Sequence, residues 1–174
     1  MTKYTIPFIL GSFLVATPAP AQNCKYVKEF KDPFTNVVTK GAQMTIGNPI
    51  AGKDVLFQIQ DGKLYLGLGI VFNDLGTIPF KKGDKISFKL ANGEVIEISP
   101  AADVEPRAIR VMNVEAQQWF VLQEVPRKVY EQLASSPITA IKYHLKNDFF
   151  IAGIKDRQTS KIMENAACML TLVN

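Results

Sequence analysis

Residues 55–60 and 63–70 alternate between apolar and polar side chains, and they meet at Asp61-Gly62. Alternation of this length is typical of half-buried β-strands, and Asp-Gly favours a two-residue hairpin turn. Pairing across this turn places Ile59 opposite Leu64, Phe57 opposite Leu66 and Val55 opposite Leu68, so that all six share one face. The sequence therefore predicts a β-hairpin with one buried face. Its other face is expected to be wetter and carries Leu56, Gln58, Gln60, Lys63 and Tyr65.

A second hairpin is predicted from residues 85–90 and 94–98. A two-residue turn would leave Ile96 and Ile98 on the wrong face, whereas a three-residue loop, Ala91-Asn92-Gly93, places Phe88 opposite Ile96. Such a loop needs a left-handed residue beside a bulge, and Gly93 meets that need.

The rest of the chain predicts two further strand pairs and two helices. Residues 107–114 and 117–125 form one pair, and 138–145 with 149–154 form the other, in a register that sets Leu145 opposite Phe150. A short helix is expected over 126–134, with proline in its first turn. A C-terminal helix is expected over 157–172 with Asp156 as its cap, and one apolar stripe contains Ile162, Met163, Ala166, Met169, Leu170 and Val173.

These elements indicate an α+β protein that is mostly antiparallel β. We expect a barrel or sandwich of about seven to nine strands, capped by the C-terminal helix, in a single β-rich domain over residues 22–174. Neither an internal repeat nor a linker is evident in the sequence.

Residues 1–21 have the three parts of a secretory signal peptide. Lys3 precedes an apolar run that reaches Ala16, and the segment ends in Ala19-Pro20-Ala21. The run is too short to span a bilayer as a helix and contains Pro7, and no later stretch is apolar enough to do so. The sequence therefore predicts cleavage after Ala21 and export to the periplasm or the medium.

The chain has two cysteines, Cys24 and Cys168, near the two ends of the expected mature protein. Export favours a disulfide between them, which would hold both termini; two free thiols or an intermolecular bridge are the alternatives. The alternative of a lipid-modified Cys24 is disfavoured, because Gln22 and Asn23 are bulky where a lipid-attachment site has small residues.

The sequence offers little for catalysis. His144 is the only histidine and is expected to face solvent between Lys142 and Lys146, which leaves a serine or cysteine nucleophile without a clear base. With one histidine and two paired cysteines, a zinc site is hard to assemble, and no cofactor site is indicated. Paired carboxylates leave no local motif, so a carboxylate-based hydrolase stays open as an alternative.

Two further patterns resemble binding motifs. Gly67 and Gly69 lie inside a strand and do not open a helix, so they predict close approach by another element in place of a phosphate loop. With Tyr65 they mark a candidate interaction surface. The basic cluster 81–85 has no interleaved aromatic residues, and the net charge of +4 is small, so a nucleic-acid partner is not expected.

Three stretches together resemble a group of uncharacterised small exported proteins common in Bacteroidota. They are Cys24 followed by Asp32-Pro33-Phe34-Thr35, the double hairpin 63–98 with Lys82-Gly83-Asp84, and the last hairpin leading into the helix of Cys168. Members often have glycine after the Phe-Thr pair, where this chain has Asn36, which also tolerates a left-handed turn. The resemblance implies location and architecture, and no activity.

The sequence thus favours a non-enzymatic binding or interaction module of the cell envelope or the medium. Another envelope protein is one expected partner. A carrier of a small hydrophobic ligand or lipid is the first alternative, and a lined apolar cavity would distinguish it from a module with a flat patch around Tyr65.

Overall fold

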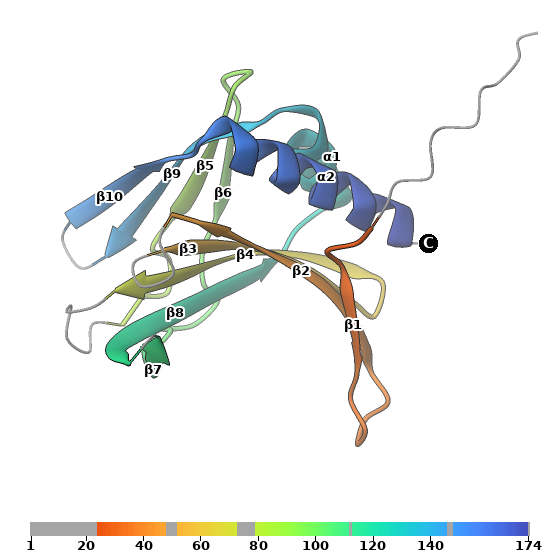
Figure 1. Cartoon of the computed structure of the whole chain (residues 1–174), viewed down its shortest axis with the longest axis horizontal. Helices are drawn as coiled ribbons and strands as arrows, with labels where there is room; N and C mark the ends of the chain where they lie inside the picture. The colour runs from red at the N-terminus through yellow and green to blue at the C-terminus, as the bar shows by residue number, and fades with distance from the viewer. Residues whose placement is uncertain (1–23, 48–51, 73–78, 112, 146–147, 174) are drawn as a thin grey trace, which may run out of the picture.

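The computed structural model describes residues 24–47, 52–72, 79–111, 113–145 and 148–173, which form two antiparallel sheets and two helices (Figure 1). The first sheet has six strands in the order β1-β2-β3-β4-β8-β7. Their bounds are β1 Lys28–Lys31, β2 Val38–Ile46, β3 Lys53–Gln60, β4 Lys63–Phe72, β8 Val114–Glu124 and β7 Arg107–Val111. This sheet is curled, and its β1 and β7 ends extend to the side away from the C-terminal helix (Figure 1).

The second sheet has four strands in the order β10-β9-β5-β6. Their bounds are β10 Asp148–Gly153, β9 Ile138–Leu145, β5 Ile86–Leu90 and β6 Val95–Ile98, and the helices are α1 Arg127–Ser135 and α2 Asp156–Leu172. Helix α2 packs on α1 and on strands β2, β3 and β9. Both helices thus lie on the same side of the six-stranded sheet as the second sheet does (Figure 1).

The core fills the space between the two sheets and the helices. Its buried residues include Phe57, Leu66, Leu68, Ile86, Phe88, Trp119, Val121, Tyr130, Ile141, Ile162 and Met169. The hydroxyl of Tyr130 donates to the Tyr65 carbonyl at 2.6 Å, and its ring meets Phe57 edge-on at 5.5 Å. Burial raises the pKa of Tyr130, because the phenolate would lose its hydration.

The structure confirms the predicted fold class and the two hairpins with the clearest alternation. Ile59 pairs with Leu64, Phe57 with Leu66 and Val55 with Leu68. Phe88 pairs with Ile96, and Gly93 has a φ of 89°, as the three-residue loop requires. The helix expected over 126–134 is α1, which Pro126 precedes at its N-cap.

Four details differ from the sequence prediction. Strands β1 and β2 were not predicted, so that the described residues hold ten strands. The turn before β8 comes earlier than expected, since Asn113 takes the left-handed conformation and Val114 already belongs to β8. Ala116, expected in the turn, is a buried strand residue.

The other two differences concern the last hairpin and the last helix. Strand β10 is shifted by two residues, so that Phe150 lies opposite Tyr143 and stacks on it at 5.4 Å, with the same face inward. Helix α2 begins at Asp156, which makes Lys155 and not Asp156 the capping position. The side chain of Gln158 accepts from the Lys155 N–H at 3.4 Å and so satisfies the backbone there.

Candidate functional site

The face of the six-stranded sheet that points away from the core forms an open trough of about 1180 Å³. Alternation along the strands separates the two faces: the side chains of Val55 and Phe57 are buried in the core, whereas Leu56 and Gln58 belong to the opposite face, on the trough. Its walls come from the segment before β1 and from the segment 103–107 that leads into β7. These walls are far apart in sequence but line the same trough.

The register arranges this face in four rows that cross the strands. In order they are Lys28, Gly41, Gln58, Tyr65 and Glu124; Gln43, Leu56, Gly67 and Leu122; Thr45, Asp54, Gly69 and Phe120; and Val71, Gln118 and Arg107. Successive rows are two residues apart, so the face extends about 20 Å along the strands from the first row to the last. The face is therefore long enough to hold an extended ligand.

Three side chains of the two middle rows, Leu56, Leu122 and Phe120, form the apolar part of the floor. Phe120 and Leu122 are 39% and 38% exposed although both are large apolar side chains. They lean over Gly67 and Gly69, and a Cβ at Gly67 would lie 2.5 Å from the Val121 carbonyl oxygen. The predicted close approach at these glycines is therefore observed, and glycine is needed at 67 for the strands to pack.

Asp54 adds a polar group beside this floor. The residue is 6% exposed, and Oδ1 has no hydrogen-bond partner among the described residues. Asp54 lies between Thr45, which lines the trough, and Gly69, over which Phe120 leans. A group that met this oxygen would have to donate a hydrogen bond.

One wall carries positive charge. Lys25, Tyr26 and Lys28 line the trough there, and the Lys25 ammonium lies 4.8 Å from the centre of the Tyr26 ring. Neither lysine forms an ion pair with a described residue. An anionic group at this end would meet two unneutralised ammonium groups.

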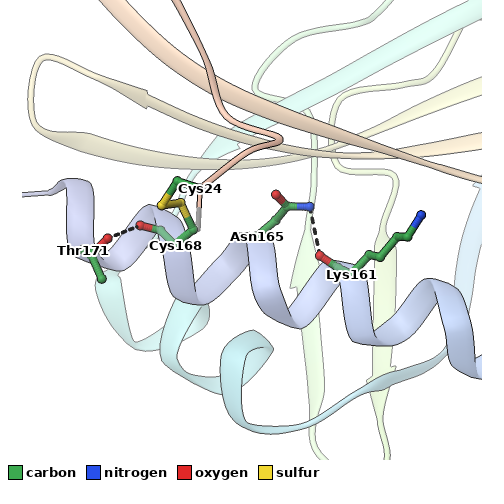
Figure 2. Close-up of a disulfide and its surroundings, with 5 residues drawn as sticks. All are labelled: Cys24, Lys161, Asn165, Cys168 and Thr171. Atoms are coloured by element: carbon green, nitrogen blue, oxygen red, sulfur yellow. Dashed lines mark hydrogen bonds between the residues drawn. A yellow bond between two sulfur atoms is a disulfide. The ribbon is translucent and has the colours of Figure 1, made fainter. Parts of the chain in front are cut away.

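The disulfide fixes this wall to the core. Cys24 is bonded to Cys168 on helix α2, with 5.6 Å between the Cα atoms (Figure 2). Cys168 lies about 120° around helix α2 from Ile162, which belongs to the apolar stripe that faces the core. Cys168 is nevertheless buried, with only 2% of its surface exposed. Directly after Cys24, the Val27 N–H donates to the Cys24 carbonyl in a tight turn that presents Lys25 and Tyr26. The trough wall is thus anchored within one turn of a covalent bond.

The opposite wall has both signs of charge. Asp103 accepts from the Lys82 N–H at 2.7 Å and from the Lys81 ammonium at 3.0 Å, and these bonds lower its pKa. Both carboxylate oxygens of Asp103 are therefore engaged. Glu105 and Arg107 line the trough beyond it.

The residues predicted from sequence are distributed as follows. Tyr65, Gly67 and Gly69 lie on the trough face in three successive rows, but Gly67 and Gly69 are buried and Tyr65 is half-buried next to Gln58. Cys24 and Cys168 hold one wall. His144 lies elsewhere, on the second sheet, 6.3 Å from the ring of Phe149.

Sequence reasoning missed the main lining residues. A signal was present at 119–122, where Trp-Phe-Val-Leu is apolar on both faces of a strand, and at Leu56, the apolar residue on an otherwise polar face. A strand in an antiparallel sheet with one solvated face alternates instead, so apolar residues on both faces indicate a second buried or binding surface.

Comparisons with protein-family models, with curated proteins and with solved structures found no match to this chain. Within the described ranges, neither helix has the length and hydropathy of a membrane span. The same residues contain no cluster of three or more potential metal ligands. The function therefore has to be argued from the trough itself.

Proposed function

We propose that this chain is an exported, non-enzymatic binding module, and that its trough carries a small molecule with an elongated apolar body. The observation that supports this most directly is the apolar part of the two middle rows, where Phe120 and Leu122 are exposed and Leu56 is half-buried at the floor of a 1180 Å³ concavity. Ligand sites are typically concave and mostly apolar with a few placed polar groups. Covering these side chains with a ligand is favourable at roughly 25 cal/mol per Å² of apolar area.

The shape of the trough favours a small ligand over a protein partner. Its floor lies below two walls, and glycine at position 41 leaves room above the sheet. A protein would need a narrow ridge to reach Leu56, whereas a flexible chain can lie along the rows. An interaction module with a protein ligand is the remaining version of this proposal.

The ends of the trough suggest the polarity of the ligand. Lys25 and Lys28 form no ion pair with any residue that the structure describes, so we expect the acidic group of an amphiphile at that end. The apolar part would then extend about 20 Å, across the rows of Leu122 and Phe120 towards Arg107.

Asp103 on the trough wall fits a structural role better than acid-base catalysis. A glycosidase needs one carboxylic acid with a raised pKa as proton donor. The pKa of Asp103 is instead lowered, and both of its oxygens already accept hydrogen bonds. We therefore assign Asp103 to holding the wall in place.

Export is supported by the disulfide, because such bonds persist in oxidising compartments and are rare in the cytosol. The sulfur of Cys24 is bonded to Cys168, so in this form it has no valence for a lipid anchor. We propose that the protein acts in the periplasm or the medium, released from its signal peptide.

The experiment is a titration with a fluorescent long-chain fatty-acid analogue, using Gly41→Leu to fill the trough. Gly41 lines the trough, and a Cβ there would lie 3.4 Å from the Phe57 carbonyl oxygen, an ordinary contact. This variant is expected to fold normally and to lose at least about ten-fold in affinity, because its side chain occupies the ligand's space.

A matched control is Lys89→Leu, which adds the same side chain to an exposed strand position on the second sheet. It is expected to bind the analogue as the unmodified protein does. Equal binding by Gly41→Leu, or no binding by the unmodified protein at micromolar concentrations, contradicts the proposal.

A further inference from the structure

The hairpin formed by β1 and β2 projects from the body of the protein (Figure 1), and it carries apolar side chains in solvent. Phe34 at its tip is 93% exposed, Phe30 is 65% exposed and Val38 is 38% exposed. Pro33 beside Phe34 is exposed as well. Single exposed apolar residues are common, but four gathered on one hairpin indicate an interaction surface.

The tip is held in a fixed shape. Asp32 Oδ1 accepts from the Thr35 N–H at 3.1 Å and from the Phe34 N–H at 2.7 Å, and these bonds lower the pKa of Asp32. The Asn36 N–H donates to the Asp32 carbonyl at 2.9 Å, with Asn36 in the left-handed conformation. The exposure of Phe34 is thus specified by a turn rather than by a loose loop.

Positive charge lies directly behind the aromatic tip. Lys28 and Lys31 on β1 form no ion pair within the described part of the chain, and Lys25 precedes them. Glu29 is 3.9 Å from Lys40, and the Asp32 carboxylate is occupied by the turn. Lys28 is about 13 Å along the strand from Asp32.

We infer that this hairpin docks on an anionic lipid surface, with Phe34 and Phe30 inserted at the interface and the lysines at the level of the head groups. Aromatic rings and basic residues are the two attractions that bring peripheral proteins to membranes. A projecting tip enters a fluid interface without a prepared pocket, whereas a protein partner must supply one for Phe34. Lipid is therefore the partner that the convex shape and the charge favour.

The hairpin also continues the trough. Phe30 is two residues beyond Lys28 on the same face of β1, opposite Thr39, and Lys28 lines the trough. A docked hairpin would place the lysine end of the trough next to the membrane, where an amphiphile enters or leaves. The docking itself stands without the proposed ligand, since it depends on the tip and the lysines of the hairpin.

The test is flotation of the folded, disulfide-bonded protein, with its signal peptide shown by mass to be absent, on phosphatidylglycerol-containing vesicles. We expect the double variant Phe30→Ser, Phe34→Ser to bind roughly ten-fold more weakly. Lys31→Gln is expected to weaken binding about five-fold, and 0.5 M salt and pure phosphatidylcholine vesicles to weaken it as well. Phe149→Ser removes a 57% exposed phenylalanine on β10 and is expected to change nothing.

A second readout is Phe34→Trp, whose emission should shift to the blue and be quenched by brominated lipid, whereas the buried Trp119 should not respond. Vesicle binding by the double variant equal to that of the unmodified protein overturns the inference. So does a change from dimer to monomer in the double variant, because the tip would then be covered by a second copy. Loss of the fatty-acid analogue in Gly41→Leu tests the trough alone and leaves these outcomes separate.

Discussion

The disulfide between Cys24 and Cys168 is expected to supply a large share of the stability. It links residues 144 apart in sequence, nearly the whole described chain. In the chain-entropy model, closing a loop of this length stabilises the folded state by about 5 kcal/mol, mainly by restricting the unfolded chain. A domain of this size has only about 5–15 kcal/mol of total stability.

The disulfide is removed in the double variant Cys24→Ala, Cys168→Ala. Alanine is preferred to serine because Cys168 is only 2% exposed, and a serine would bury an unpaired hydroxyl group there. We expect its free energy of unfolding in urea to fall by about 5 kcal/mol and its melting temperature by about 10–20 °C. Adding reductant to the unmodified protein should reproduce this loss, while the variant should not respond. A loss below about 1 kcal/mol would refute the chain-entropy reasoning for this protein.

The same variant tests the wall of the trough. Lys25 and Tyr26 directly follow Cys24, so without the bond this wall loses its covalent link to helix α2 (Figure 2). We expect weaker binding of the fatty-acid analogue at a temperature where the variant is still fully folded. Unchanged affinity there would mean that the wall holds its place through packing alone.

Three further outcomes follow from the buried groups. Gly67→Ala should destabilise the protein by about 1–3 kcal/mol, because its Cβ would meet the Val121 carbonyl oxygen at 2.5 Å. Gly41→Ala should be neutral or stabilising by up to about 1 kcal/mol. Urea unfolding of both variants checks this, and equal effects on the free energy of unfolding would contradict it. Tyr130→Phe should cost about 1–2 kcal/mol in the same assay, since the carbonyl that its hydroxyl meets at 2.6 Å loses a donor. Burial raises the pKa of Tyr143 to about 12 and also raises the pKa of Tyr130. Both tyrosines therefore ionise in the unfolded chain before they do so in the folded protein, so stability should be retained below about pH 10 and fall above it. The expected fall is about 1.4 kcal/mol per pH unit for each tyrosine. Unfolding at several pH values should show a shallower fall in Tyr143→Phe, and an equal slope would count against this assignment.

Local patterns were enough for the hairpins 55–70 and 86–98. In both, the apolar face and the turn residues allow a single register, so Phe57 opposite Leu66 and Phe88 opposite Ile96 follow from the sequence. Strand β1 gave no such signal, because all four of its residues are exposed and pairing with β2 alone defines it. The alternation in β2 is weak, since Gly41 and Ala42 interrupt it.

The last hairpin illustrates a different limit. Moving β10 by two residues keeps the same face inward, so the hydrophobic pattern cannot distinguish the two registers. The stacking of Phe150 on Tyr143, which accompanies the observed register, is a tertiary contact. The two registers therefore differ in their tertiary packing and not in their local sequence pattern.

The trough depended on information that no local window contains. Its floor brings Leu56 on β3 next to Leu122 on β8, with Gly67 between them, and its walls come from residues 25–28 and 103–107. The sequence indicated Tyr65, Gly67 and Gly69 as a surface strip, but the curl of the sheet that makes this strip concave is a property of the whole sheet.

The most direct test of the proposed carrier is native mass spectrometry of the protein, gently purified from its own host, beside Gly41→Leu prepared in the same way. We expect a folded protein with the added mass of a small molecule, which is lost on denaturation and is absent from Gly41→Leu. A folded protein with the mass of the disulfide-bonded polypeptide alone, or the same added mass on Gly41→Leu, would contradict the trough as the binding site.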